Sequence, residues 1–195
     1  MKKPSELKNL VEQTKRREKI KKEKVDIKWI ITIIIVAFTI SFGLSFVANS
    51  TIPNLSLAFG IIITLLFIII GILFDIIGVS VTGADEAVFH SMAARKVKGA
   101  STAVKFKKNA DKTSSFCCDV IGDICGVISG AAGTTICAIL VTKYHTDLLI
   151  TGLVITAIIS SLTIGGKALG KSFAINKSDI ILYEFAKFVS NFYKG

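Results

Sequence analysis

No charged side chain occurs between Trp29 and Phe74, and only a short polar link interrupts the apolar residues of this stretch. A helix of about 20 apolar residues spans the hydrocarbon core of a bilayer. This stretch and two later apolar runs predict membrane spans at 29–48, 57–81, 119–142 and 147–169. The first run is too long for a signal peptide, and no small-residue cleavage motif follows it. We expect an all-α integral membrane protein with four transmembrane helices.

The positive charges are distributed unevenly between the two sides of these spans. Of the 24 Lys and Arg residues, 23 lie in residues 1–28, 82–118 and 167–195, and Lys143 alone lies on the opposite side. The positive-inside rule places the more basic side in the cytoplasm. The sequence thus predicts a multi-pass protein of the cytoplasmic (plasma) membrane with both termini in the cytoplasm.

Residues 1–28 form a basic N-terminal arm with eleven Lys and Arg and five Asp and Glu. Pairs such as Glu12 with Arg16 have helical spacing, so the arm is either a solvated helix or disordered. The net charge of +10 makes anionic lipid or a protein a candidate partner of the arm. Nucleic acid is not expected as a partner, because the basic residues lack interleaved aromatic side chains.

Two other polar segments predict helices outside the spans. Residues 84–117 predict basic cytoplasmic juxtamembrane helices, one that stops at Gly99 and one that starts with Ser101 as its cap. Residues 178–193 predict an amphipathic helix that lies either at the membrane surface or against the ends of the spans. The four cysteines lack the spacing of a zinc site or a disulfide framework, so we expect packing thiols.

Carboxylates within the predicted spans are the strongest functional signal, because an unpaired charge in the hydrocarbon core is costly. Asp75 lies near the cytoplasmic end of the second span, and Asp119 and Asp123 lie four residues apart near the start of the third. These two spans run in opposite directions. Asp75 and Asp123 are therefore expected to meet at a similar depth, with Asp85 and Glu86 just below.

Small and hydroxylated residues accompany these acids. Glycines four residues apart permit close helix contact in the third and fourth spans; they are Gly122, Gly126 and Gly130, followed by Gly166 and Gly170. Between Gly78 and Gly83 the helix is expected to loosen and to release carbonyl groups. Carboxylates, hydroxyls and carbonyls are hard oxygen ligands that suit Mg²⁺ or Na⁺. The sequence therefore predicts a cation site with Glu86 and Asp123 as principal ligands, Asp75 as a further acid, and Ser80 and Thr82 as auxiliary oxygens.

A structural role for the same charges is the alternative. Asp75 can pair with a lysine of the fourth span, such as Lys167. Asp85 and Glu86 can stabilise the N-terminus of the helix that follows them. His90 lies one turn after Glu86 and is expected to be its surface partner rather than a metal ligand.

Taken in order, these segments resemble the transmembrane domain of the CNNM/CorB family of magnesium transporters. "GADEAV" is similar to the family's S-x-x-E-T-A motif, with Glu86 at its glutamate. "IGDICG" places Gly122 and Asp123 where the family has G-N. "GGKALGKSFA" resembles the closing G-E-x-x-P-K-x-x-A motif, with Lys171 at its lysine and Ala174 at its alanine.

The resemblance covers residues 57–193, and the basic arm and an additional span at 29–48 precede it. It implies a homodimer with an ion site that opens toward the cytoplasm and is formed by Glu86, hydroxyl groups and the residue at Asp123. It also implies magnesium export, with Na⁺ as a candidate coupling ion.

This sequence departs from the family motifs at several positions. Gly83 stands at the serine of the first motif, Asp123 at the asparagine of the second and Gly170 at the proline of the third. We also expect the chain to lack the family's CBS-pair domain. The prediction is Mg²⁺ transport or binding through an acidic intramembrane site, and the alternative is a non-transporting membrane scaffold or accessory protein of the same fold. No arrangement of a nucleophile with a general base occurs, so an enzyme is not expected.

Overall fold

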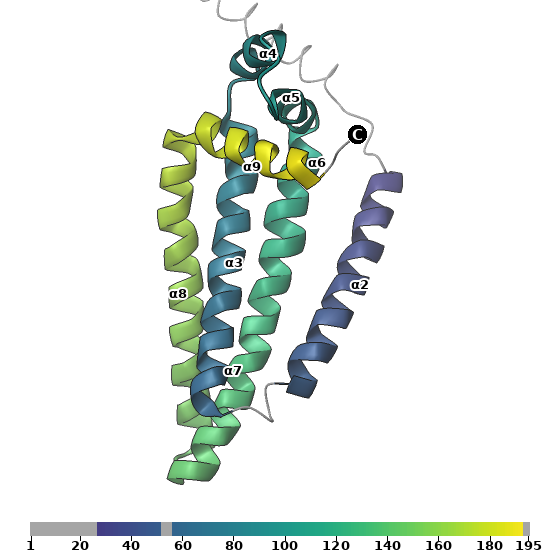
Figure 1. The fold of residues 1–195 in the computed structure, drawn as a ribbon. Helices are drawn as coiled ribbons and strands as arrows, with labels where there is room; N and C mark the ends of the chain where they lie inside the picture. The colour runs from purple at the N-terminus through teal and green to yellow at the C-terminus, as the bar shows by residue number, and fades with distance from the viewer. Residues whose placement is uncertain (1–26, 52–55, 193–195) are drawn as a thin grey trace, which may run out of the picture. The chain divides into compact units, whose positions relative to one another are not determined.

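A computed structural model describes residues 27–51 and 56–192, and the regular structure in these ranges is helical. In chain order the elements are α2 (Ile27–Thr51), α3 (Leu57–Gly83), α4 (Glu86–Ala94), α5 (Ala100–Lys108), α6 (Ala110–Ser115), the π-helical segment η2 (Phe116–Gly122), α7 (Asp123–Tyr144), α8 (Leu148–Asn176) and α9 (Ser178–Phe192) (Figure 1). The chain divides into two units, residues 1–34 and 35–195. Most of the predicted basic arm, residues 1–26, lies outside the described residues.

Four helices are long and apolar enough to cross a membrane, namely Ile27–Val47, Leu57–Gly83, Ala110–Tyr144 and Leu148–Asn176. The prediction of an all-helical protein with four such helices is therefore confirmed. Large apolar side chains, for example Phe59, Leu153 and Leu169, are exposed along them. Exposed apolar surface of this extent is typical of helices that face lipid.

Two threonines of α2 bond to their own helix. The hydroxyls of Thr32 and Thr39 donate to the carbonyl oxygens of Lys28 and Ile35, one turn earlier, both at 2.8 Å. A hydroxyl that bonds to its own helix needs no other partner in a medium without water. These two hydroxyls are therefore compatible with a lipid environment.

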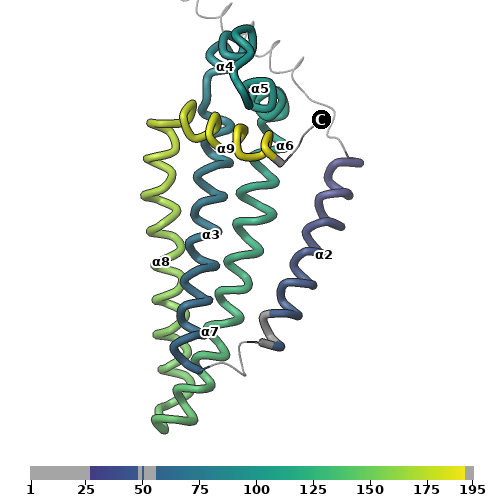
Figure 2. Tube along the Cα trace, viewed as in Figure 1, coloured from purple at the N-terminus to yellow at the C-terminus, as the bar shows by residue number. Residues whose placement is uncertain are grey.

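α3, α7 and α8 pack on one another as a three-helix bundle, and Figure 2 shows their traces side by side. Glycines on α3 let α7 and η2 approach closely. A Cβ atom at Gly71 would lie 3.1 Å from the Cβ of Cys125, and one at Gly78 would lie 3.1 Å from the Ser114 carbonyl oxygen and overlap Sγ of Cys118. The third span therefore packs on α3 at a distance that only glycine permits.

Glycines on α8 act in the same way against α3, as the sequence predicted. A Cβ atom at Gly170 would lie 2.7 Å from Cγ1 of Ile76, and one at Gly166 would overlap another isoleucine of α3. The prediction of close contact is wrong for Gly126 and Gly130, where an added Cβ would meet nothing within 4 Å. The reason is that α7 and α8 separate there around a groove.

α4, α5 and α9 pack around one end of α3, and we call these three helices the cap. Together with the end of α3 and the link that follows it, they form a small apolar core of Val81, Ala84, Phe89, Ala103, Leu182 and Ala186. The rings of Phe106 and Phe185 stack beside it with centroids 5.5 Å apart. α9 therefore docks against the end of α3, which is the second of its two predicted placements.

Gly99 is the last residue of the link between α4 and α5. Its φ of 85° lies in the left-handed region that favours glycine, and a Cβ there would lie 2.8 Å from Cα of Lys187 in α9. The prediction that the first cap helix runs to Gly99 is wrong, because α4 ends before Arg95 and Lys96 adopts a φ of 55°. The prediction of Ser101 as the cap of α5 is also wrong, since Gly99 occupies the N-cap position.

Replacing Gly78 with Ala is expected to destabilise the bundle, whereas the same replacement at Gly165 is not. The new methyl group at residue 78 meets Cys118 and the Ser114 carbonyl, while the one at Gly165 meets nothing within 4 Å. We expect Gly78→Ala to lose about 1–3 kcal/mol of unfolding free energy, as overpacked sites do. The difference in stability can be measured by thermal unfolding in detergent, with the reaction of the buried cysteines with a thiol dye as the signal. Equal melting temperatures for the two variants would contradict the close packing of α3.

Candidate functional site

Three charged side chains, one from each helix of the bundle, meet within the apolar spans. Nζ of Lys167 on α8 lies 3.7 Å from Oδ1 of Asp75 on α3 and 3.7 Å from Oδ1 of Asp123 on α7. We call Asp75, Asp123 and Lys167 the ion cluster. The predicted convergence of Asp75 and Asp123 is confirmed, and so is the pairing of Asp75 with Lys167, which the sequence offered as the structural alternative to a cation site.

The helices bring these residues to one level. Asp75 lies eight residues before the end of α3 and Lys167 nine residues before the end of α8. These separations correspond to about 12 and 14 Å along the helix axes. Asp123 is the first residue of α7 and directly follows η2. The ion cluster is therefore embedded in the bundle on the side of the cap.

The π-helical segment η2 lies beside the ion cluster. Such segments occur often at functional sites. The thiol of Cys118 donates to the Asp75 carbonyl oxygen at 3.6 Å, which holds η2 against α3. A Cβ atom on the buried Gly122 would lie 3.6 Å from Nζ of Lys167. This is an ordinary van der Waals separation, so Gly122 lies directly beside the ammonium group.

The ion cluster carries one negative charge in excess. The side chains of Asp75 and Lys167 are 17% and 27% exposed, whereas that of Asp123 is 72% exposed. A separation of 3.7 Å is too long for a hydrogen bond, so the ammonium forms two loose ion pairs. Both carboxylates therefore retain unused acceptor capacity for water or a cation.

Asp85 and Glu86 lie in the cap, at the start of α4. Oδ1 of Asp85 accepts a hydrogen bond from the backbone N–H of Ala87 at 2.9 Å, and the Asp85 N–H donates to Asp179 at 2.8 Å. Glu86 is exposed and pairs with His90 at 3.1 Å. The predicted surface pair is confirmed, and so is the helix-starting role of Asp85. The structure does not bring Glu86 into the ion cluster.

Ser80 and Thr82 use their hydroxyls within α3. Each donates to a carbonyl oxygen of its own helix, at 2.7 and 2.8 Å. α3 stays helical to Gly83, so the predicted loosening of this stretch is wrong. The last carbonyl groups accept from Nζ of Lys107, at 2.8 Å for Thr82 and 3.2 Å for Val81. The cap thus supplies a cation of its own to the end of α3.

Asp119 and Lys171 extend the faces that carry the ion cluster. Asp119 lies one turn before Asp123, and Lys171 one turn after Lys167. Both are exposed, and neither forms an ion pair with another described residue. They are charged neighbours of the ion cluster rather than members of it.

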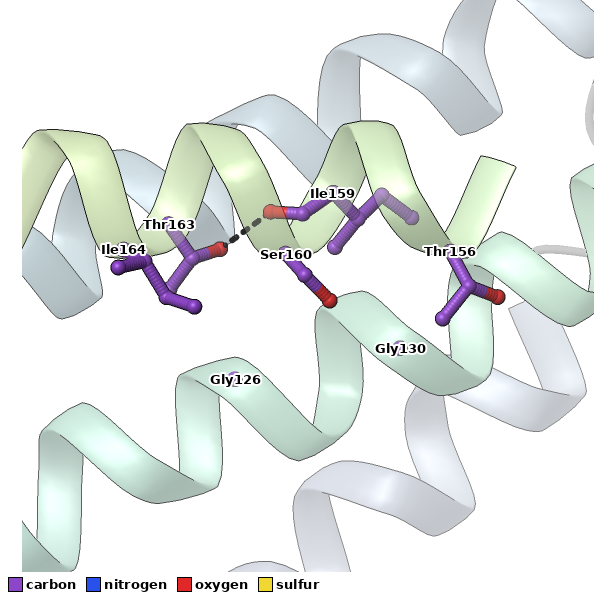
Figure 3. A pocket seen from close by; sticks show the side chains of 7 residues that line it. All are labelled: Gly126, Gly130, Thr156, Ile159, Ser160, Thr163 and Ile164. Carbon is purple, nitrogen blue, oxygen red and sulfur yellow. Dashed lines mark hydrogen bonds between the residues drawn. The ribbon is translucent and has the colours of Figure 1, made fainter. Parts of the chain in front are cut away.

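A groove of about 210 Å³ lies between α7 and α8, next to the ion cluster (Figure 3). Gly126 and Gly130 line it on α7, and Thr156, Ser160 and Thr163 line it on α8. Gly126 was among the residues predicted from the sequence, whereas the three hydroxyl residues were not. Their spacing of four and three residues, which places them on one face of a helix, is the signal that identifies them.

Within residues 27–51 and 56–192, no three His, Cys, Asp or Glu side chains gather as a metal-binding group. Mg²⁺ is commonly held by one or two protein carboxylates together with water, so the two carboxylates of the ion cluster fit a partly hydrated ion.

Comparison with known proteins gives no match to a protein-family model, to a curated protein or to a solved structure. The resemblance to the CNNM/CorB family therefore stays a prediction.

Replacing Lys167 with Met is expected to destabilise the protein more than replacing Lys171 with Met. Lys167→Met leaves Asp75 without its partner in a mostly buried position, whereas Lys171 is exposed and outside any ion pair of the described residues. We expect Lys167→Met to lose about 1–3 kcal/mol of unfolding free energy. This is less than the loss for a fully buried ion pair, because Asp123 is exposed.

Thermal unfolding in detergent checks the expected loss, and Asp75→Asn in the Lys167→Met background should restore part of the stability, because it removes the unpaired charge. Equal melting temperatures for the two lysine variants would contradict the pairing.

Proposed function

We propose that this chain binds a cation and transports it across the membrane, with Mg²⁺ as the first candidate and Asp75 and Asp123 as ligands. The supporting observation is the ion cluster, in which two intramembrane carboxylates from different helices share one lysine and keep an excess negative charge. Ionisable residues within membrane spans commonly mark ion pathways. Placing a charge there costs free energy, and proteins tolerate this cost where the charge has a function.

Lys167 gives this site a defined state without a bound cation. Its ammonium group compensates one of the carboxylates, so the pair is not left with two unbalanced charges in a poorly solvated place. A cation that binds between Asp75 and Asp123 has to displace the ammonium, because both positive charges would occupy the same space. The flexible four-carbon stem of lysine permits that movement. Cation binding and Lys167 displacement are therefore coupled in this proposal.

The distribution of Lys and Arg supports a cytoplasmic position for the cap and for both termini, in the cytoplasmic membrane. The cap helices would then be cytoplasmic juxtamembrane helices. The resemblance to the CNNM/CorB transmembrane domain supports Mg²⁺ as the transported ion, Na⁺ as the coupling ion and a homodimer as the assembly. Anionic lipid or a protein partner is the proposed ligand of the basic arm.

A second candidate function is a membrane scaffold or accessory protein of the same fold that does not transport. The observation that favours it is the degree to which polar groups are already paired. Lys167 contacts both acids of the ion cluster, Glu86 is paired with His90, and Lys107 binds the end of α3. In this function the ion cluster would only hold the three helices together.

Mg²⁺ flux into proteoliposomes is expected for the wild type and is expected to fall at least tenfold in Asp75→Asn and Asp123→Asn. Each substitution removes a negative ligand while it keeps the size of the side chain. A magnesium-sensitive dye enclosed in the vesicles measures the flux. Asp111→Asn is the matched control, because this exposed acid of α6 lies outside the ion cluster.

Glu86→Gln separates two assignments of the site. Flux that survives Glu86→Gln and is lost in Asp123→Asn supports the ion cluster as the binding site. Flux that is lost in both Glu86→Gln and Asp123→Asn would instead support the site expected from the sequence motifs, which contains both residues. Absence of flux from folded wild-type protein would refute transport and leave the scaffold function.

A further inference from the structure

We propose that the groove between α7 and α8 is the hydrated route by which the cation moves between the ion cluster and the half of the membrane remote from the cap. This inference rests on the proposed cation transport and adds a path to its site. None of the residues that line the groove is charged, so the groove would let the ion pass rather than bind it tightly. A conducting path needs sites weak enough for the ion to leave.

The two helices place the groove directly after the ion cluster. α7 and α8 run antiparallel, with Asp123 opposite Lys167. Further along, Gly133 packs against Ile159, where an added Cβ would overlap its side chain. The groove begins near the ion cluster, includes Ile159 in its lining and continues on α8 to Thr156, one turn further from Lys167. Gly126 follows Asp123 by three residues on α7, so one helical turn separates the ion cluster from the groove.

Two of the three hydroxyl groups that line the groove do not bond to their own helix. A serine or threonine in a lipid-exposed helix ordinarily bonds to a carbonyl group of the preceding turn, as Thr163 does to Ile159 at 2.8 Å. Figure 3 shows the side chains of Thr156 and Ser160 pointing from α8 toward α7. Among the described residues their hydroxyls have no hydrogen-bond partner, so both remain available to water or to a cation.

The opposite wall of the groove is bare backbone. Gly126 and Gly130 face it, and a Cβ atom at either position would meet nothing within 4 Å. A groove of about 210 Å³ has room for several water molecules. Glycine at these two positions therefore keeps open a space that a larger side chain would fill without a clash.

Filling the groove is expected to block flux and to leave cation binding intact. Gly130→Leu places an isobutyl group in the groove, whereas Gly165→Leu is the matched control, because its Cβ also meets nothing within 4 Å and it lies outside the groove. We expect Mg²⁺ flux to fall at least tenfold in Gly130→Leu and to stay within twofold of the wild type in Gly165→Leu. Calorimetric titration with Mg²⁺ in detergent should give the same affinity for all three proteins.

The outcomes separate the route from the site. Flux in Gly130→Leu equal to that of the wild type overturns the route and leaves the proposed function standing. Wild-type protein without Mg²⁺ binding or flux overturns both. Equal losses of flux in Gly130→Leu and Gly165→Leu also overturn the route, because the loss would then come from any added leucine on these helices.

Chemical labelling tests the route independently of flux and of the leucine variants. In a background with the four native cysteines replaced by Ala, Ser160→Cys should react with a charged, water-soluble methanethiosulfonate, and Mg²⁺ should slow the reaction. Leu169→Cys, at an exposed apolar position on α8 outside the groove, is the control and should stay unreactive. Ser160→Cys that is as unreactive as Leu169→Cys would show that lipid fills the groove and would overturn the proposal.

Discussion

Lipid does not solvate charge, and this constraint explains how α3, α7 and α8 meet. Each of these helices contributes one charged residue to the ion cluster. Facing lipid is costly for each of these charges, and the arrangement that brings Lys167 between Asp75 and Asp123 offsets part of that cost. The ion cluster and the close contacts at Gly71, Gly78 and Gly170 together set the level of the three helices relative to one another.

Glycine determines where the bundle is tight and where it is open. Gly78 and Gly170 lie at crossings where a methyl group would clash, and they let the helices approach until backbone and side chain touch. Gly126 and Gly130 have the same four-residue spacing as Gly166 and Gly170, but a Cβ atom at either of them would meet nothing within 4 Å. The same residue type thus serves close packing on α3 and an open groove on α7, and the difference depends on what stands opposite it.

The parts of the fold that the sequence predicted are those that depend on local composition. Apolar length identified four spans, and the opposite directions of two spans predicted that Asp75 and Asp123 meet. The position of Glu86 depends on the cap, where Phe89 of α4 is buried against residues of α9 that lie far away in the chain. The groove was missed because it depends on where α7 and α8 separate. Spacing shows that Ser160 and Thr163 share a face, but it does not show which helix stands opposite.

The charge of the ion cluster also bears on which cation would replace Lys167. With the ammonium in place, two carboxylates and one positive charge leave a net charge of −1. A monovalent cation in place of the ammonium would leave the same net charge of −1 on the two carboxylates. It would also lose translational freedom on binding, which the tethered ammonium does not. A divalent cation would make the cluster neutral, and in a medium of low dielectric constant that difference is large. Two carboxylates that share one lysine are therefore better matched to a divalent ion such as Mg²⁺ than to Na⁺, since only the divalent ion removes the excess charge that Lys167 leaves.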